Sequence, residues 1–358
     1  MTIKAPYPFF GAKSAIASAL WQCFGHVSAY VEPFCGSAAV LLACPYDLSV
    51  VTLNDIDGFI VNFHRTIAAD PDAVARWIDY PVTELDLFAR HCWLINQADD
   101  LVRRLQTDPE YYDARIAGWW CWGACAWIGA GWCAGTGPWN VEDGEIVNIR
   151  DAGNAGQGVN RQLPHLGNAG RGINRQLPHL CDAGQGVNRG VWATDGACDA
   201  MSAHLHNYMR QLRDALRRPR VTCGDWQRVV TPSVTTRHGT CAVLLDPPYG
   251  EGAMEYSGGG NADSQLAADV WAWAVAHGND PLLRIAVCAY DDGRIVPPGW
   301  DVLRWKAPAG YQQTDSAQQN PAREIVYLSP HCLHPIRNAF SQPRVAAESD
   351  WTDTLFAE

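Results

Sequence analysis

The stretch CAVLLDPPYG at residues 241–250 constrains the fold more than any other part of the chain. Residues 242–245 are continuously apolar, which is typical of a short strand buried on both faces of a parallel sheet. Pro247 and Pro248 have fixed φ angles and no N–H donors, so they end the strand and stiffen the backbone that follows. Asp246 is therefore predicted at the carboxyl end of a buried strand, where open α/β sheets bind their ligands.

Asp246 and Tyr249 together offer a fixed hydrogen-bond acceptor beside a flat ring. This combination suits a planar amine such as a nucleobase, which stacks on an aromatic side chain while its amino group meets an acceptor. An ordinary strand-terminating turn is the alternative, and an Asp-Pro pair alone would favour it. The full Asp-Pro-Pro-Tyr sequence after an apolar strand favours the functional interpretation.

A strand, a tight loop and a helix are predicted within AYVEPFCGSAAVLL at residues 29–42. Small residues in such a loop let a ligand approach the backbone at the helix N-terminus, as in nucleotide-binding α/β units. The residues of this predicted ligand-binding loop are Glu32, Pro33, Phe34, Cys35, Gly36 and Ser37.

A second short strand is predicted at residues 50–53, followed by Asn54-Asp55-Ile56-Asp57. An acidic residue about twenty positions after the first glycine loop commonly holds a pair of ribose hydroxyls. Asp55 fits this role, and Asp57 competes with it. The alternative is that Asp55 only caps a helix over residues 58–69.

Strands and helices continue to alternate on either side of a central region that does not follow this pattern. Most of the tryptophans between residues 119 and 139 are expected in the core, because Trp at near-helical spacing usually packs. This pattern predicts one α/β domain with a large insertion. Helices are expected at 14–24, where Ser14 would be the cap, and at 83–128 and 200–218; strands are expected at 220–223, 283–289, 302–306 and 324–328.

Residues 153–190 repeat with a period of fourteen, in two full copies and one partial copy. Each copy has few apolar residues and cannot bury much, so stacked turns, a long loop and a hairpin all remain open. A low-complexity insertion expanded by duplication is the alternative to a functional element. Arg and Asn read guanine and adenine edges or grip phosphates, and each copy carries such a pair: Asn160-Arg161, Asn174-Arg175 and Asn188-Arg189.

Charge and composition limit the classes of partner. The net charge of −11 argues against a broad nucleic-acid-coating surface, although seven arginines lie between residues 200 and 240. If DNA binds, we expect a local basic cleft to hold it. The thirteen cysteines have no zinc-site spacing, so no metal is expected. Without a membrane-length apolar run or a signal-peptide core, the expected location is cytoplasmic.

These motifs together resemble the Dam-type (D12 class) N6-adenine DNA methyltransferases, over roughly residues 5–70 and 200–330. PFFGAK is similar to the N-terminal motif of that family, VEPFCGSAAVLL to its cofactor loop and NDID to its second acidic motif. CGDW resembles the acidic motif before the catalytic strand, and DPPY is the catalytic motif itself. The motif order is that of the α group, and RIAVCAYDDG and residues 321–324 resemble phage-type members.

The resemblance implies a Rossmann-like α/β sheet that binds S-adenosylmethionine and methylates adenine N6 in double-stranded DNA after flipping the base. It implies cofactor binding by Phe9, Lys13, the loop 32–37, Asp55, Asp225 and Asp246. Asp246, Pro247, Pro248 and Tyr249 would be catalytic, and Asp225 would bind the cofactor's adenine amine. A restriction–modification context is part of the same expectation. The single glycine Gly36 and residue Ala12 depart from the family pattern, as does the repeat insertion.

The expected domains are a discontinuous catalytic domain at 1–82 and 199–340, a target-recognition insertion at 83–198 and an acidic tail at 341–358. Weaker DNA contacts are expected from Asn160, Arg161, Asn174, Arg175 and Arg189. Two alternatives stay open: methylation of cytosine N4 or of RNA on the same scaffold, and a catalytically silent DNA-binding protein that uses the repeats.

Overall fold

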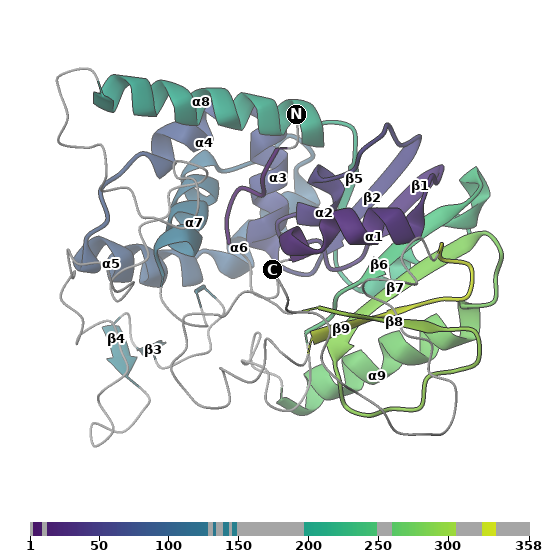
Figure 1. Cartoon of the computed structure of the whole chain (residues 1–358). Helices are drawn as coiled ribbons and strands as arrows, with labels where there is room; N and C mark the ends of the chain where they lie inside the picture. Colours follow the sequence, from purple (N-terminus) through teal and green to yellow (C-terminus); the bar gives the residue numbers. More distant parts are fainter. Residues whose placement is uncertain are drawn as a thin grey trace, which may run out of the picture.

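The structure is a computed structural model, and it confirms the predicted α/β fold (Figure 1). It describes residues 3–8, 13–127, 132–133, 139–142, 145–148, 197–248, 260–305 and 324–333. Only the backbone course is described for 139–142, 145–148, 197–201 and 260–264. The repeats at 153–190 and the tail at 341–358 lie outside the described residues.

A seven-stranded sheet forms the centre of the fold, in the order β5-β2-β1-β6-β7-β9-β8. Five neighbouring strands are parallel, and β9 is antiparallel to β7 and β8, between which it lies. This is the doubly wound order, with one antiparallel strand inserted near an edge. The strands are β1 Ala29–Glu32, β2 Val50–Asp55, β5 Arg220–Cys223, β6 Cys241–Leu245, β7 Leu283–Tyr290, β8 Asp301–Arg304 and β9 Glu324–Leu328.

The strands predicted from sequence are all present, with two informative differences in their ends. The strands at 220–223 and 324–328 have the predicted limits. β2 continues past Leu53 to Asp55, because Asn54 and Asp55 pair with Thr222 and Cys223 of the distant β5. β8 ends at Arg304 rather than at residue 306.

Alternate residues of β6 fill the two sides of the sheet. Cys241, Val243 and Leu245 pack in one core with helix α9 (Gly260–His277). Ala242 and Leu244 pack in another core with helix α1 (Ala17–Phe24), which lies on the opposite side of the sheet (Figure 1). This burial on both faces explains the continuous apolar run.

The start of α1 differs from the prediction. Residues 13–15 form the 3₁₀ helix η1 (Lys13–Ala15), and α1 begins only at Ala17, with Ile16 as an N-cap that makes no side-chain hydrogen bond. Ser14 therefore does not cap α1. The separate turn of η1 places Lys13 in the protein interior, with 3% of its surface exposed.

The segment predicted to be helical at 83–128 forms three helices rather than one continuous region. Asn96 ends the first, and Asp108-Pro109 follows the second, where proline cannot continue the helix. As expected, Trp120, Trp122 and Trp127 are buried. The helices are α5 Glu84–Ile95, α6 Ala98–Thr107 and α7 Ala114–Ala126.

These helices share one apolar core with the helices on either side of them in the sequence. Thus the segment at 83–126 packs directly on the part of the chain that forms the sheet, and Leu53 of β2 belongs to the same core. The domain limits at residues 82 and 199 stay a prediction. The flanking helices are α3 Gly58–Ala69, α4 Pro71–Ile78 and α8 Ala197–Leu216, and the core also receives α2, Ala39–Leu42.

The remaining described elements are short. β3 (Trp139–Glu142) and β4 (Glu145–Asn148) form a two-stranded hairpin separate from the sheet. η6 (Trp226–Val229) and η7 (Thr236–His238) lie between β5 and β6. No described helix combines the length and the apolar composition that a bilayer crossing requires.

Candidate active site at the carboxyl edge of the sheet

Four of the predicted acidic site residues meet at one edge of the sheet. Glu32 ends β1, Asp55 ends β2, Asp225 follows β5 and Asp246 follows β6. Because β1, β2, β5 and β6 are parallel, these carboxyl ends lie along the same edge. The strand order reverses between β1 and β6, which is where sheets of this type form their ligand crevice.

Several predicted site residues cannot be placed. Phe9 and Tyr249 lie outside the described residues, as do Asn160, Arg161, Asn174, Arg175 and Arg189 of the repeats. The two prolines after Asp246 are described, with Pro247 buried and Pro248 partly buried.

The loop after β1 is held in a tight curl by hydrogen bonds. The backbone N–H of Cys35 donates to the Asn54 carbonyl at 2.9 Å, and that of Gly36 donates to Oδ2 of Asp55 at 3.0 Å. Gly36 and Ala38 have φ angles of 45° and 53°. Left-handed backbone is strained for alanine and is commonly found where a binding site requires it.

Tyr7 supports this loop from the other side. Its hydroxyl donates to the Gly36 carbonyl at 2.9 Å, and its ring packs edge-on against Phe63 and Trp120. Cys35 and Ser37 are buried, whereas Phe34 is only partly buried. The loop is therefore rigid, with a small curled backbone next to Asp55, as expected of a ligand-binding loop.

Asn54 connects three strand ends and was not among the predicted site residues. Its side-chain amide donates to the carbonyls of Pro33 and Gly224, at 3.0 and 2.9 Å. Its oxygen accepts from the Thr222 hydroxyl at 2.8 Å. Asn54 is 1% exposed. The sequence offers only the position of Asn54 beside Asp55 as a signal, since its partners are remote in the chain.

Asp57, not Asp55, caps helix α3. Its Oδ1 accepts from the Phe59 N–H at 2.7 Å, so the proposed capping role of Asp55 is wrong. Asp55 instead accepts from the backbone N–H groups of Gly36 and Asp57. Burial raises the pKa of Asp55, and these two N–H groups oppose the shift. Burial, together with the nearby Asp55, raises the pKa of Asp57 to about 7.

Lys13 lies between two carboxylates at the end of β6. Its Nζ is 3.0 Å from Oδ1 of Asp246 and 4.0 Å from Oε2 of Glu324, the first residue of β9. Burial would lower the pKa of Lys13, but attraction to Asp246, with Glu324 adding to it, raises the pKa above its ordinary value. Lys13 therefore stays protonated and neutralises part of the acidic charge here.

Glu32 is a buried carboxyl of the same region. Burial raises the pKa of its carboxyl well above the ordinary value, and the adjacent Tyr30 hydroxyl opposes this shift. Repulsion by Asp246 and Asp55 acts in the same direction as burial. Oε2 of Glu32 is buried without a hydrogen-bond partner. A buried polar atom of this kind is often satisfied by a ligand.

Asp225 stands at the outer end of the edge. Its Oδ1 accepts from the Gln227 N–H at 2.8 Å, which caps η6, and the residue is exposed. The next residue, Trp226, is buried with its ring centroid 6.2 Å from that of Phe34. A carboxylate has several lone pairs, so the cap leaves Asp225 with capacity for another donor.

Only part of the arginine-rich segment lies beside these residues: Arg228 of η6 donates to the Cys223 carbonyl at 3.0 Å, close to Asp225. Arg217 and Arg218 follow α8, and Arg220 begins β5, whose carboxyl end is the one near Asp225. These three exposed arginines are thus at the opposite edge of the sheet. Arg210 of α8 pairs with Asp72. The expected local basic cleft for DNA stays a prediction, with Arg217, Arg218 and Arg220 at the edge of the sheet opposite the site.

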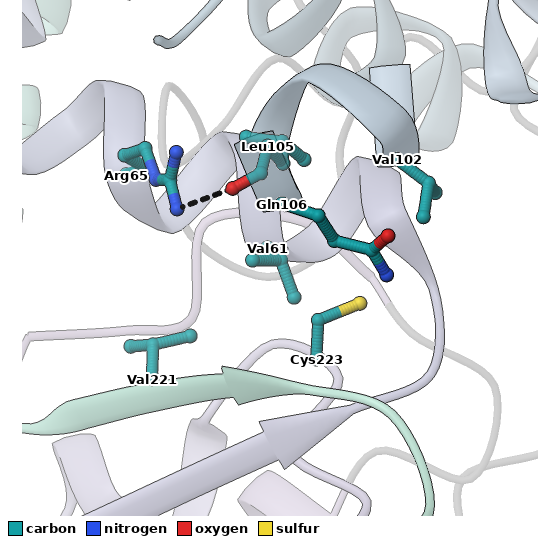
Figure 2. A pocket seen from close by; sticks show the side chains of 7 residues that line it. All are labelled: Val61, Arg65, Val102, Leu105, Gln106, Val221 and Cys223. Atoms are coloured by element: carbon teal, nitrogen blue, oxygen red, sulfur yellow. Dashed lines mark hydrogen bonds between the residues drawn. The ribbon is translucent and has the colours of Figure 1, made fainter. Parts of the chain in front are cut away.

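A cavity of about 180 Å³ lies outside the site, between α3, α6 and β5 (Figure 2). It contains no carboxylate, and the guanidinium of Arg65 already donates to the Leu105 carbonyl at 3.1 Å. Its one titratable thiol, Cys223, has its pKa raised by burial, so the cavity lacks a group suited to acid–base chemistry near neutral pH. Its lining residues are Val61, Arg65, Val102, Leu105, Gln106, Val221 and Cys223. Among the side chains that the structure describes, no cluster of three or more His, Cys, Asp or Glu is arranged to hold a metal.

Residues 9–110 match the family described as D12 class N6 adenine-specific DNA methyltransferase. The matched segment contains Lys13, the loop after β1, and Asp55. A search of the curated proteins finds no match. The family match supports methylation of adenine N6 in DNA as the activity, and S-adenosylmethionine is the methyl donor that this family implies. It favours this activity over cytosine-N4 methylation, RNA methylation and a catalytically silent protein.

Asn54→Ala is expected to weaken both the fold and cofactor binding. It removes the donor to the carbonyls of Pro33 and Gly224, and it leaves the Thr222 hydroxyl with the Leu53 carbonyl as its remaining partner. We expect the free energy of unfolding to fall by about 2–4 kcal/mol in urea titrations. We also expect the Kd for S-adenosylmethionine in calorimetry to rise about tenfold, equivalent to about 1.4 kcal/mol.

Asn62→Ala is the matched control. Asn62 is also buried, and it exchanges two hydrogen bonds with Asp113 within the helical core. Its loss should reduce stability comparably while leaving cofactor affinity unchanged. If Asn54→Ala bound the cofactor as tightly as wild type, the positioning role of Asn54 would be refuted.

Asp57→Asn is expected to change how stability depends on pH. A carboxyl whose pKa rises on folding keeps its proton longer in the native state, so the fold loses stability as pH rises from about 4 to about 7. Asparagine caps helices as well as aspartate does and carries no charge. The variant should therefore be more stable than wild type at pH 8 and equal to it near pH 4, in thermal unfolding across pH. Asp70→Asn, at the cap of α4, controls for changing a charged cap.

Proposed function

We propose that the carboxyl edge of the sheet is the active site of an adenine-N6 DNA methyltransferase. S-adenosylmethionine would bind at the ends of β1, β2 and β5, and the target adenine at the end of β6. One observation carries the proposal: Asp246 follows the buried strand β6 at the switch point of the sheet, next to the strained loop after β1. The proposal includes the α-group motif order and phage-type membership.

The residues at this edge fit the cofactor. Asp55 and Asp225 offer carboxylates for its ribose hydroxyls and its adenine amine, and Ile56 between Asp55 and Asp57 is 76% exposed, offering an apolar surface for a ring. The curled backbone at Gly36 and Ala38 allows close approach. A site with several carboxylates also suits a ligand that carries a positive charge. S-adenosylmethionine supplies, when bound, a methyl group on a positively charged sulfur.

The chemical task of Asp246 follows from the electronic structure of adenine. The lone pair of its N6 amine is delocalised into the ring, which makes the nitrogen a poor nucleophile. Hydrogen bonds from the amine to Asp246 and to the Pro247 carbonyl would localise the lone pair by drawing the nitrogen toward a tetrahedral shape. Pro247 and Pro248 keep these acceptors in place because their φ angles are fixed. Asp246 also stabilises the positive charge that develops on the amine.

The target base would reach Asp246 only after it leaves the duplex. Tyr249, which follows Pro248, is proposed to stack on the flipped base. Lys13, Phe9 and the loop 32–37 would complete the pocket on the cofactor side. The reaction then depends mainly on holding the two reacting groups in line at close range.

Asp246→Asn is expected to lower the rate of methyl transfer by at least about 10³-fold, since the developing charge loses its carboxylate. Transfer of tritiated methyl groups to unmodified DNA measures the rate, and calorimetry at saturating cofactor separates a loss of chemistry from a loss of cofactor binding. Asp55→Ala is the contrasting variant, expected to raise the KM for the cofactor more than it lowers kcat. Wild-type rates in Asp246→Asn would refute the proposed chemistry.

We further propose that the repeats at 153–190 contact DNA through their Asn-Arg pairs, within a target-recognition region at 83–198. Replacing Arg161, Arg175 and Arg189 together by alanine should lower the slope of log K against log salt by about 0.9 for each phosphate that the arginines neutralise. Filter binding over a salt series measures this slope, and intact cofactor binding controls for folding. An unchanged slope and site preference would show that the repeats do not bind DNA. The cytoplasmic location and the link to restriction–modification remain predictions.

A further inference from the structure

We infer that Glu324 is a positioning residue for Asp246: it shares Lys13 with Asp246 and so leaves the Asp246 carboxylate able to accept the target amine. This inference rests on the proposed function of the carboxyl edge. Glu324 lies outside the matched segment, 9–110. It belongs to the segment 321–324 that resembles phage-type members, but that resemblance assigns it no role.

The topology of the sheet explains how Glu324 reaches the site. β9 is antiparallel to β7, and Glu324 pairs with Tyr290, the last residue of β7. The first residue of β9 therefore lies at the edge where the parallel strands end. Among the described strands of the sheet, β9 is the one that brings its amino end to this edge.

The described contact of the Glu324 carboxylate is with the ammonium of Lys13. Its side chain is 11% exposed, and its Oε2 is buried without a hydrogen bond, 4.0 Å from Nζ of Lys13. The same Nζ is 3.0 Å from Oδ1 of Asp246. A buried carboxylate without full hydrogen bonding is unfavourable for stability, so a role in the site is the more direct explanation for it.

The charges explain why a second carboxylate helps. A lysine paired with Asp246 alone would neutralise it and weaken it as a hydrogen-bond acceptor. With Glu324 ionised, the Lys13 ammonium is shared between two carboxylates, so Asp246 keeps more of its negative charge for the amine as it becomes positive. Glu32 does not replace this charge, because burial raises its pKa well above the ordinary value and favours its neutral form.

The pH dependence of the reaction should report on Glu324. Among the residues that the structure describes, the charges that act on Glu324 are those of Lys13 of η1 and Asp246 after β6. Cys288 of β7 acts on Lys13, and Tyr290 of β7 is the strand partner of Glu324. Burial raises the pKa of Glu324, Lys13 opposes this shift and Asp246 adds to it. Below that raised pKa Glu324 is neutral, and of the two carboxylates only that of Asp246 still attracts Lys13. The value of kcat should therefore increase as pH rises through the pKa of Glu324.

The test compares kcat for methyl transfer across pH in wild type and Glu324→Gln, with duplex DNA and saturating S-adenosylmethionine. Glutamine has nearly the same shape but no charge. We expect kcat above pH 7 to fall about 10- to 100-fold. The acid limb due to Glu324 should disappear, and the calorimetric Kd for S-adenosylmethionine should stay unchanged. A purely structural role would lower the melting temperature without removing the acid limb.

Glu324→Asp keeps the negative charge but withdraws it from Lys13 by one methylene. It should lower kcat less than Glu324→Gln and retain the acid limb, and it carries the test if Glu324→Gln does not fold. Wild-type kcat and an unchanged pH profile in either folded variant would overturn the inference. Absence of methyl transfer by the wild-type protein would instead overturn the proposed function, so the two failures are distinguishable.

Discussion

The hydrogen bonds of Asn54 and Asp55 are the interactions on which the candidate site depends most. Parallel strands end in loops, and loops have no pairing partner of their own once the strands stop. Through the Asn54 amide, the loop after β1 and the turn after β5 are both fixed to the end of β2. The Asp55 carboxylate then fixes Gly36 in its left-handed conformation. Two adjacent residues thus determine the shape of an edge built from segments far apart in the chain.

The buried titratable groups at this edge are tolerated because burial favours the neutral form of one carboxyl, while the lysine keeps its positive charge next to the other carboxylates. Glu32 is driven toward its neutral form by burial, which raises its pKa, whereas Lys13 is kept protonated by the carboxylates around it. The excess of acid would be costly in an ordinary core, where well-packed apolar groups are at least as stabilising. It suits a site for a cationic methyl donor and an amine that becomes positive during reaction.

The strands and the position of Asp246 could be predicted because their signals are local. An apolar run that ends in two prolines specifies a buried strand and its end whatever the rest of the chain does. The signal that placed Asp55 at the end of a short strand was also local. The residue that caps α3, however, is Asp57 rather than Asp55. Asn54 and Glu324 could not be predicted in this way. The partners of Asn54 are the carbonyls of Pro33 and Gly224, and the partner of Glu324 is Lys13. Sequence periodicity contains no information on pairs that are so remote in the chain.

The antiparallel strand β9 shows how topology can add function to a site. In a sheet whose strands are all parallel, every residue at the ligand edge is a strand end followed by a loop. Inserting one antiparallel strand brings a strand beginning to that edge, held by hydrogen bonds to β7 and β8 on both sides. Glu324 therefore begins a paired strand, whereas Asp55 ends a strand and Asp225 caps η6. Strand pairing thus fixes the backbone of the residue whose carboxylate lies 4.0 Å from Nζ of Lys13, and site residues carried on strands are held more precisely than those carried on loops.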